Sequence, residues 1–476
     1  MTGIRCRQGA SSVRHRSLRG CARAAAASLL AAVLAACAPL PTQPDREVPL
    51  PQSWRGAPAG AAATADPARW WRELGDPALD ALVDAALAQN LGLAEAQHRL
   101  RAARAQSEAT RLRFVPQLNA RTLSAPNVES TASYFQVGFD ASWELGLFGR
   151  RDAEKQVAAA DVAQADADVA AARVSVVAET VRTYLELRAA QARCDVQRRQ
   201  LAAAQATLQR ARRLQALGLG GSTEVDKAQS AWQSEQARAA QLAGLPPAQA
   251  QALAQLLGRT QIDLDWLQPA PLPVVPAAAA APAPAELLRT RPEIRRAEWA
   301  VERAAGELGI ARAELWPQLN IGGSLTYASK LDGDELLPPT SIVSIGPMIS
   351  IPLLDWGMRR AAAVAHGELL AAAVIRYRAA VVDGAAEVQN SLAALQTARE
   401  RHAALAARVA EAPQRLARIT RLQALGLADA SGLAEAERAE IELDAERLDA
   451  QATALQALVA LYKALGGAPP PLEAAP

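Results

Sequence analysis

The sequence predicts a mainly α-helical fold with membrane-inserted β-structure and two structural repeats per chain. Alanine is abundant, whereas aromatic residues make up only 4% of the 476 residues. Alanine favours helix and has little volume, so thin helices packed at close range fit this composition better than one thick globule. Segments in which apolar and polar residues alternate strictly predict strands, and sequence motifs recur 201 or 208 positions apart.

An internal repeat organises the chain. Residues 213–219 and 421–427 have the same sequence, 208 positions apart. The Pro-Gln-Leu-Asn motif at 116–119 recurs at 317–320, an offset of 201. The second copy therefore contains seven extra residues after this motif, where we expect a loop because loops tolerate insertions.

Changes in composition divide the chain into five predicted segments. A basic and then apolar N-terminal stretch is typical of an export signal, and a proline- and alanine-rich stretch between the copies cannot be regular helix. The predicted segments are a lipoprotein signal peptide over 1–36, a first repeat over 37–268, a Pro/Ala linker over 269–285, a second repeat over 286–467 and a disordered tail over 468–476.

The N-terminus carries six arginines and no acid before an unbroken run of small and apolar residues over 24–36. That run is shorter than the roughly 20 residues that a membrane-spanning helix needs. It ends in Leu34-Ala35-Ala36-Cys37, which resembles the lipobox of bacterial lipoproteins, so Cys37 is the predicted lipidation site. The alternative is a plain secretory signal followed by a chance cysteine.

Charge and cysteine content exclude several classes of protein. Removing the six N-terminal arginines from the 51 basic residues leaves 45 against 49 acidic residues, a net charge of −4. A mildly acidic mature chain gives no reason to expect nucleic-acid binding. Beyond Cys37 only Cys194 remains, so no disulfide framework is expected. No later apolar run has the length of a membrane helix, so any membrane-spanning part must be β-structure.

Each copy contains a candidate β-hairpin with one apolar and one polar face. Alternation over about ten residues is typical of a transmembrane barrel strand, although a half-buried soluble sheet gives the same pattern. Four strands per chain cannot close a barrel, which needs about eight, so copies of the chain must share one. The apolar residues predicted to mark these strands include Phe135, Val137, Phe139, Trp143, Ile321, Leu325, Ile345 and Ile349.

Each copy also contains a helix of moderate length, over 76–113 or 286–314, and then a long helix, a turn and a returning helix. A helix over 151–217 would be about 100 Å long, which suits a tube rather than a globular domain. Pro413 should bend or interrupt the second long helix. Residues seven apart predict a coiled-coil seam in both copies: Thr180, Leu187, Cys194, Leu201 and Leu208, and then Val388, Leu395, His402, Val409 and Leu416.

Four motifs in order resemble the TolC-type outer-membrane factor family, in its lipoprotein branch of OprM-like and NodT-like proteins. They are Trp-Trp-Arg-Glu-Leu-Gly-Asp-Pro-Ala-Leu at 70–79, Phe-Val-Pro-Gln-Leu at 114–118, Ser-Trp-Glu-Leu-Gly-Leu-Phe-Gly-Arg at 142–150 and Arg-Pro-Glu-Ile-Arg-Arg-Ala-Glu at 291–298.

The resemblance implies a homotrimer in the bacterial outer membrane, lipid-anchored and extending into the periplasm. Its chains would share a transmembrane β-barrel and form a long α-helical barrel. The tube would be a passive conduit for small molecules such as drugs, joined by a periplasmic adaptor (membrane fusion) protein to an inner-membrane pump of the RND type.

The resemblance also implies roles for the two helix turns and for two acids. The turns would be periplasmic tips that meet the adaptor, although each could be a plain helical hairpin turn; Ser222, Asp429 and Ser431 are candidate helix caps. Glu435, with Glu224 as its approximate partner, would help to close the entrance, or it could be an ordinary solvated charge. The predicted tip residues are Leu217, Gly218, Gly221, Ser222, Leu425, Gly426, Asp429 and Ser431.

The sequence predicts no catalytic residues, no metal and no cofactor other than the lipid on Cys37. No pattern resembles a nucleophile–base pair, a phosphate loop or a metal cluster, so an enzyme is not expected. Two alternatives to a drug-efflux duct remain. One is the outer-membrane duct of type I protein secretion, and the other is a coiled-coil envelope lipoprotein that forms no channel.

Overall fold

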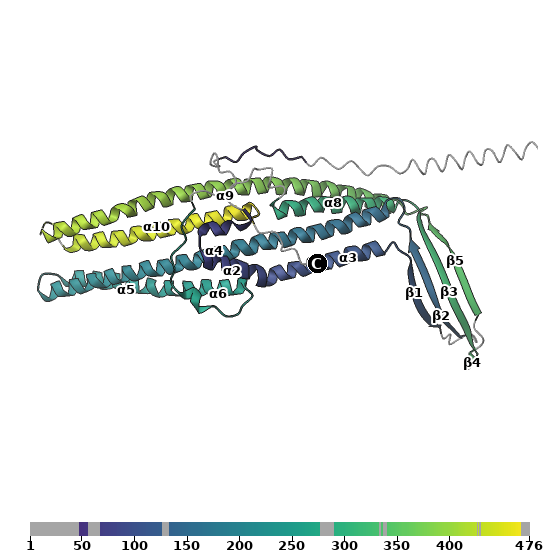
Figure 1. Ribbon diagram of the computed structural model, residues 1–476, viewed down its shortest axis with the longest axis horizontal. Helices are drawn as coiled ribbons and strands as arrows, with labels where there is room; N and C mark the ends of the chain where they lie inside the picture. The colour runs from purple at the N-terminus through teal and green to yellow at the C-terminus, as the bar shows by residue number, and fades with distance from the viewer. Residues whose placement is uncertain are drawn as a thin grey trace, which may run out of the picture. The chain divides into compact units, whose positions relative to one another are not determined.

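The computed structural model describes residues 47–55, 67–125, 133–276, 290–332, 335–336, 340–425, 427 and 430–467. Two compact units make up the chain (Figure 1). A β unit lies within Arg113–Glu154 and Ala305–Glu368, and a helical unit lies within Arg46–Leu112, Lys155–Ala304 and Leu369–Pro476. Cys37, the predicted signal segment and the predicted tail lie outside the described residues.

The β unit is an antiparallel sheet in the order β1-β2-β3-β4, with β5 also pairing with β3. The seven residues by which the second copy is longer lie after the part of β3 that matches β1, where β3 continues to Asp332 and the short strand β4 forms. The strands are β1 (Gln117–Ala125), β2 (Ser133–Glu144), β3 (Gln318–Asp332), β4 (Glu335–Leu336) and β5 (Thr340–Ser350).

Strand pairing gathers the predicted apolar residues on one face of the sheet. Phe139 lies opposite Leu325, which in turn lies opposite Val343, and Trp143 lies opposite Ile321. Side chains directly opposite each other point to the same face, and successive side chains along a strand point to opposite faces. One face therefore carries most of the large apolar residues of the four long strands, whereas Ile342 and Met348 of β5 lie on the other face.

Most of the chain is helical, and none of the described helices has the length and apolar composition of a membrane span. The helices are η1 (Pro67–Leu74), α2 (Pro77–Gln89), α3 (Leu91–Leu112), α4 (Arg150–Ala216), α5 (Ser222–Ala243), α6 (Leu245–Leu256), η2 (Leu264–Leu267), α8 (Pro292–Ala313), α9 (Met358–Ala424) and α10 (Ala430–Ala464).

The internal repeat is reproduced in the helix bounds. The helices α3 and α8 each contain 22 residues and begin 201 positions apart. The helices α4 and α9 each contain 67 residues and begin 208 positions apart. In Figure 1, α5 returns alongside α4 and α10 returns alongside α9, so each copy forms one long helical hairpin.

Two helices that were predicted to be continuous are each broken into two. The single helix expected over 76–113 is broken at Asn90, which leaves the helical conformation and whose side-chain Oδ1 accepts a hydrogen bond from Leu93 N at 2.9 Å. The returning helix of the first copy is broken at Gly244, just before two prolines, whereas α10 is continuous. Pro246 and Pro247 have no N–H group to bond back to the preceding turn, and proline is favoured in the first turn of a helix, so α5 ends and α6 begins here.

Pro413 does not interrupt α9, contrary to the prediction. Proline removes one backbone hydrogen bond, but this helix is also held by packing against α10. Leu405 and Ala412 of α9 are buried with Leu443 and Ala450 of α10 in one apolar cluster. Tertiary packing of this kind supplies most of the stability of protein helices, so one lost bond does not end the helix.

The main core of the helical unit surrounds the two tryptophans of η1. Trp70 is 1% exposed and stacks on Tyr462 of α10, with ring centroids 4.8 Å apart. Tyr462 Oη also donates to Glu73, and burial raises the pKa of this carboxyl group. The segment Pro67–Leu74 is therefore packed against a helix of the second repeat.

Asp76 fixes the same segment to the first repeat. Its carboxylate caps α2 by accepting from Ala78 N at 3.0 Å, and it also accepts a hydrogen bond from Tyr184 Oη of α4. Burial and this hydrogen bond to the acid raise the pKa of Tyr184 to about 12. Two acid–tyrosine contacts thus join the segment 67–76 to both repeats.

The heptad seam is buried most deeply at its first two positions in each copy, which are Thr180, Leu187, Val388 and Leu395. Cys194 and His402 are half-buried at equivalent positions. Burial raises the pKa of the Cys194 thiol, and burial together with the charge of Arg447 lowers the pKa of His402. Both shifts favour neutral side chains, as expected for residues that serve packing.

Candidate functional site

The apolar face of the sheet is open in a single chain. Ile345 is 84% exposed, and Ile349, Phe139 and Val137 are also exposed. A contiguous exposed apolar surface of this kind marks a site of contact with protein or membrane. Phe135 lies in β2 opposite Ser329, and Trp143 is half-buried and donates its Nε1–H to Phe114 O at 3.1 Å.

The opposite face of the sheet is mainly polar, although it also carries Ile342 and Met348 of β5. Arg121 of β1 forms an ion pair with Asp140 of β2 at 3.0 Å, and the hydroxyl groups of Ser324 and Ser344 are hydrogen-bonded at 2.8 Å. Side chains at alternate positions of β2 place Asp140 and Glu144 on this face. The sheet therefore has one face suited to lipid and one suited to water.

An ion-pair cluster lies where β2 leads into α4. Arg150 Nε contacts Glu144 and Glu154, both at 3.1 Å, and Arg113 contacts Glu154 at 3.1 Å. Arg150 and Glu154 are largely buried, so each charge has an opposite charge as neighbour, as buried charges require. The cluster fixes the chain where the sheet changes to helix; the sequence motif at 142–150 contained Glu144 and Arg150 but gave no sign of this role.

The two helix turns have the same closing geometry. Leu219 N donates to Leu214 O at 2.8 Å around Gly218, whose φ is +71°. Leu427 N donates to Leu422 O at 2.9 Å, 208 positions later. This bond pattern is the common C-terminal stop that requires glycine in a left-handed conformation. Gly426 and Asp429 lie outside the described residues.

The predicted cap of α5 is not formed. Gly221 occupies the N-cap position without a side-chain hydrogen bond, and Ser222 is already the first residue of the helix. A hydroxyl group caps a helix only from the residue before its first turn, so Ser222 lies one position too late. Ser431 likewise lies inside α10, which begins at Ala430.

Exposed leucines are the common feature of the two turns. Leu217 and Leu219 are 72% and 74% exposed, and Leu425 and Leu427 are 67% and 73% exposed. Sequence reasoning singled out Leu217 and Leu425, and it included Leu219 and Leu427 only as parts of the turns. Because these side chains are similarly exposed, each turn presents a pair of leucines on its surface.

The two predicted gate acids are exposed near the turns and are staggered. Glu224 is the third residue of α5, whereas Glu435 is the sixth residue of α10. At the repeat offset of 208, Glu435 corresponds to Lys227 and not to Glu224. Among the described residues neither carboxylate forms an ion pair, so their role in closing an entrance stays a prediction.

If Glu435 does help to close the entrance, Glu435→Ala should raise single-channel conductance in planar bilayers. Removing the carboxylate takes away the contacts by which this acid would hold the entrance closed, so the closed state should loosen. Loss of a negative ring, which repels anions and attracts cations, should also admit anions more readily. Lys227→Ala is the matched control at the equivalent position of the first copy. Unchanged conductance in Glu435→Ala would contradict the role of this acid.

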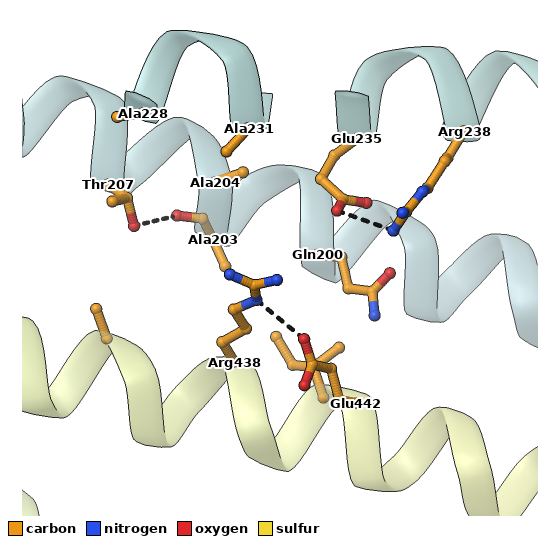
Figure 2. Close-up of a pocket in the computed structure, with 12 residues that line it drawn as sticks. Gln200, Ala203, Ala204, Thr207, Ala228, Ala231, Glu235, Arg238, Arg438 and Glu442 are labelled. Atoms are coloured by element: carbon orange, nitrogen blue, oxygen red, sulfur yellow. Dashed lines mark hydrogen bonds and ion pairs between the residues drawn. The ribbon is translucent and has the colours of Figure 1, made fainter. Parts of the chain in front are cut away.

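A small cavity of about 110 Å³ lies where the α4–α5 hairpin meets α10 (Figure 2). Alanines of all three helices line it, and its ion pairs, Arg438–Glu442 at 2.9 Å and Arg238–Glu235 at 3.3 Å, each join two residues of one helix. Since these charges are already satisfied, the cavity offers no free charged group to a ligand. In the described part of the chain, no group of three His, Cys, Asp or Glu residues could hold a metal ion.

Comparison with known proteins identifies the family. The family model described as outer membrane efflux protein matches residues 82–259 and 283–467. The chain belongs to this family. The two matched segments cover the long helical hairpins and both strand pairs, and the family predicted from the sequence is confirmed.

The relatives extend over most of the chain. Outer membrane protein OprJ of Pseudomonas aeruginosa is 29% identical over 456 residues, which cover 93% of this chain and 95% of that protein. Nodulation protein T of Rhizobium leguminosarum bv. viciae is 27% identical and covers 78% of each chain. These relatives are named as outer-membrane and nodulation proteins, not as enzymes.

Solved structures share the fold. The outer-membrane channel OprN is 27% identical with a TM-score of 0.75, and the two structures match over 90% of this chain and 99% of that one. The open state of the MtrE outer membrane channel of Neisseria gonorrhoeae is 26% identical with a TM-score of 0.78, over 90% and 98%. The predicted fold class is confirmed.

Proposed function

We propose that this chain is one subunit of a homotrimeric outer-membrane duct in a tripartite efflux system. The duct would carry small molecules such as drugs to the exterior from a periplasmic adaptor and an inner-membrane pump of the RND type. The observation that carries the proposal is the sheet, which has an apolar face open to its surroundings and a polar face behind it.

The edges of the sheet support assembly from several copies. Among the described strands β1 pairs only with β2, and β5 pairs only with β3 and not with β1. An unpaired edge in lipid leaves several backbone groups without hydrogen bonds, which costs several kcal/mol each. Pairing β5 of one copy with β1 of the next removes both edges, and it closes a barrel only when several chains contribute.

The helical hairpins support a passive conduit. The two 67-residue helices would each be about 100 Å long at about 1.5 Å per residue. The turns at their ends present exposed leucine pairs, which suit an apolar contact with an adaptor protein. Energy would come from the pump, and the duct itself would need no cofactor beyond the lipid.

The names of relatives favour small molecules as cargo. One relative is the toluene efflux pump outer membrane protein TtgC of Pseudomonas putida, which is 25% identical over 463 residues. Another is the pyoverdine export protein OpmQ of Pseudomonas aeruginosa. A duct for type I protein secretion is the alternative within the same fold. A coiled-coil lipoprotein without a channel would not account for the open apolar face.

Cys37 would carry the lipid and anchor the subunit, while the strands span the membrane. Cys37→Ser should therefore weaken sorting to the outer membrane but still allow purified chains to form a trimer. Membrane fractionation and native mass spectrometry would measure both effects. A monomeric Cys37→Ser protein would show that this division of roles is wrong.

Two measurements test the proposed function. The purified trimer should conduct ions in planar bilayers, and deletion of the gene should make cells more susceptible to dyes, detergents or antibiotics. Complementation with the intact gene is the control. A protein that never conducts would contradict a channel, and unchanged susceptibility to every compound would favour protein secretion over drug efflux.

A further inference from the structure

We infer that Arg376 on α9 of one copy forms an ion pair with Glu95 on α3 of the next copy, in the register in which Asp168 on α4 pairs with Arg296 on α8 within one chain. This inference rests on the homotrimer proposed above and adds which surfaces meet and which residues pair. The partner is a second copy of the chain, and the argument depends on the internal repeat.

The contact between α4 and α8 joins the first repeat to the second. Its three ion pairs have the same polarity, because the acid is always on α4 and the arginine is always on α8. The three ion pairs are Asp161–Arg303 at 2.8 Å, Asp166–Arg295 at 3.4 Å and Asp168–Arg296 at 2.8 Å.

The repeat offsets relate contacts in the first repeat of the chain to contacts in the second repeat. Leu93 of α3 and Val176 of α4 are buried in one cluster. Their counterparts at offsets of 201 and 208 are Ile294 and Gly384, and a Cβ on Gly384 would lie 3.3 Å from Ile294 Cδ1. Equivalent residues are therefore packed together between the shorter helix and the long helix of each repeat, and the offsets identify structurally equivalent positions.

Within one chain the end of the first repeat contacts the start of the second repeat. The end of the second repeat has no such neighbour in the same chain. In the sheet, β2 of the first repeat pairs with β3 of the second, and β1 and β5 are the outer long strands. The contact that would follow β5 is with β1 of another copy. For the helices, the same step brings α9 of one copy to α3 of the next.

At the proposed contact between copies of the chain, one ion pair has its two charges exchanged. At the offset of 208, Asp168 corresponds to Arg376, and at the offset of 201, Arg296 corresponds to Glu95. An acid and an arginine that meet within the chain thus become an arginine and an acid that would meet between copies. A reversal on one side only would have placed two like charges together.

The other two pairs lose both charges together. Asp161 and Arg303 correspond to Leu369 and Ala102. Likewise, the counterparts of Asp166 and Arg295 are Val374 and Ala94. An unpaired charge at a helix contact would be destabilising, so paired replacement is what a real contact between these positions requires.

The side chains of the proposed ion pair and of Leu369 are accessible in a single chain, whereas Val374 is already buried within it. Leu369 is 55% exposed on α9, and Arg376 is exposed and forms no ion pair within the described part of the chain. The Glu95 side chain is 61% exposed and bonds to Arg99 at 2.7 Å. Such an exposed pair within one helix contributes little, so Glu95 can also meet a second arginine.

The sheet repeats the same relation at separate residues. Leu145 N donates to Leu319 O at 3.4 Å where β2 and β3 meet. Their counterparts are Leu353 and Leu118, which are 89% and 70% exposed in one chain. The register therefore places Leu353 of one copy beside Leu118 of the next.

Charge reversal tests the helix contact. Glu95→Arg and Arg376→Glu should each lower the trimer fraction at fixed protein and detergent concentration at least about twofold, because like charges meet at every contact between copies. The double variant Glu95→Arg/Arg376→Glu should restore it. Native mass spectrometry measures the fraction, and Arg99→Glu/Arg376→Glu is the matched control that should not restore it.

A cysteine pair tests the register without depending on charge. In a Cys194→Ser background, Leu118→Cys with Leu353→Cys should yield disulfide-linked oligomers on oxidation, whereas Asn119→Cys with Leu353→Cys, on the opposite face, should not. Trimer formation and conductance of each variant are measured in parallel with those of the wild-type chain. These measurements identify which variants fold, and each charge or cysteine variant that folds tests the register.

The outcomes separate the inference from the proposed function. A conducting trimer whose charge variants are not rescued, or whose Leu118/Leu353 cysteines do not cross-link, would overturn this register and leave the function standing. A wild-type chain that neither conducts nor forms a trimer would overturn both.

Discussion

Ile345→Arg is expected to prevent the chain from accumulating in the outer membrane as a trimer. Ile345 is 84% exposed and lies opposite Gly323, on the face that carries most of the large apolar residues of the sheet. An arginine that faces lipid costs about 2–4 kcal/mol near the middle of the bilayer, and a homotrimer would contain three of them. Membrane fractionation followed by native electrophoresis measures the effect.

Ser344→Arg is the matched control, because it introduces the same charge one residue earlier. Ser344 lies on the polar face, where its hydroxyl group is hydrogen-bonded to that of Ser324 at 2.8 Å. We expect the trimer to form and conductance to change only modestly, since a water-facing surface tolerates charge. Equal loss of membrane protein in both variants would show that the two faces of the sheet do not differ as proposed.

Trp70→Ala is expected to lower the free energy of unfolding by about 3–5 kcal/mol, as for other buried tryptophans that are truncated to alanine. The indole is 1% exposed, stacks on Tyr462 and meets Trp71 edge-on with ring centroids 6.2 Å apart. Its loss would leave a cavity between the N-terminal segment and the second repeat. Chemical unfolding followed by circular dichroism in detergent measures the change.

Trp70→Phe keeps an aromatic ring that can stack on Tyr462. Among the described residues, Trp70 Nε1 has no acceptor within hydrogen-bond distance, so a phenyl ring loses volume but no hydrogen bond. We expect less than half of the destabilisation of Trp70→Ala. If both variants unfold at the same denaturant concentration, the stacking on Tyr462 contributes nothing measurable.

Local pattern was enough to predict the elements of this fold. Alternation marked β2, β3 and β5, and β5 ends at Ser350, shortly before Pro352, which has no N–H group for the ladder. Glycine after a leucine-rich helix end marked both turns. Such signals are short-range: each depends on a few neighbouring residues, which the sequence displays directly.

Contacts between distant residues were not predictable from the same patterns. The acid–tyrosine contacts of Glu73 and Asp76, with Tyr462 and Tyr184, join residues 389 and 108 positions apart. The motif at 70–79 contained both acids but gave no partner for either. Continuity of α9 through Pro413 likewise depends on α10, which no property of the proline itself reveals.

The sequence by itself therefore determined the repeat, the element types, the family and the two-faced character of the strands, because periodicity and repetition are properties of a linear chain. The tertiary structure decided which residues share a face, which acids meet tyrosines and which charges meet across α4 and α8. Those facts depend on packing between segments hundreds of residues apart, where many pairings satisfy the same local pattern and only the whole arrangement of buried surface and paired charge selects one.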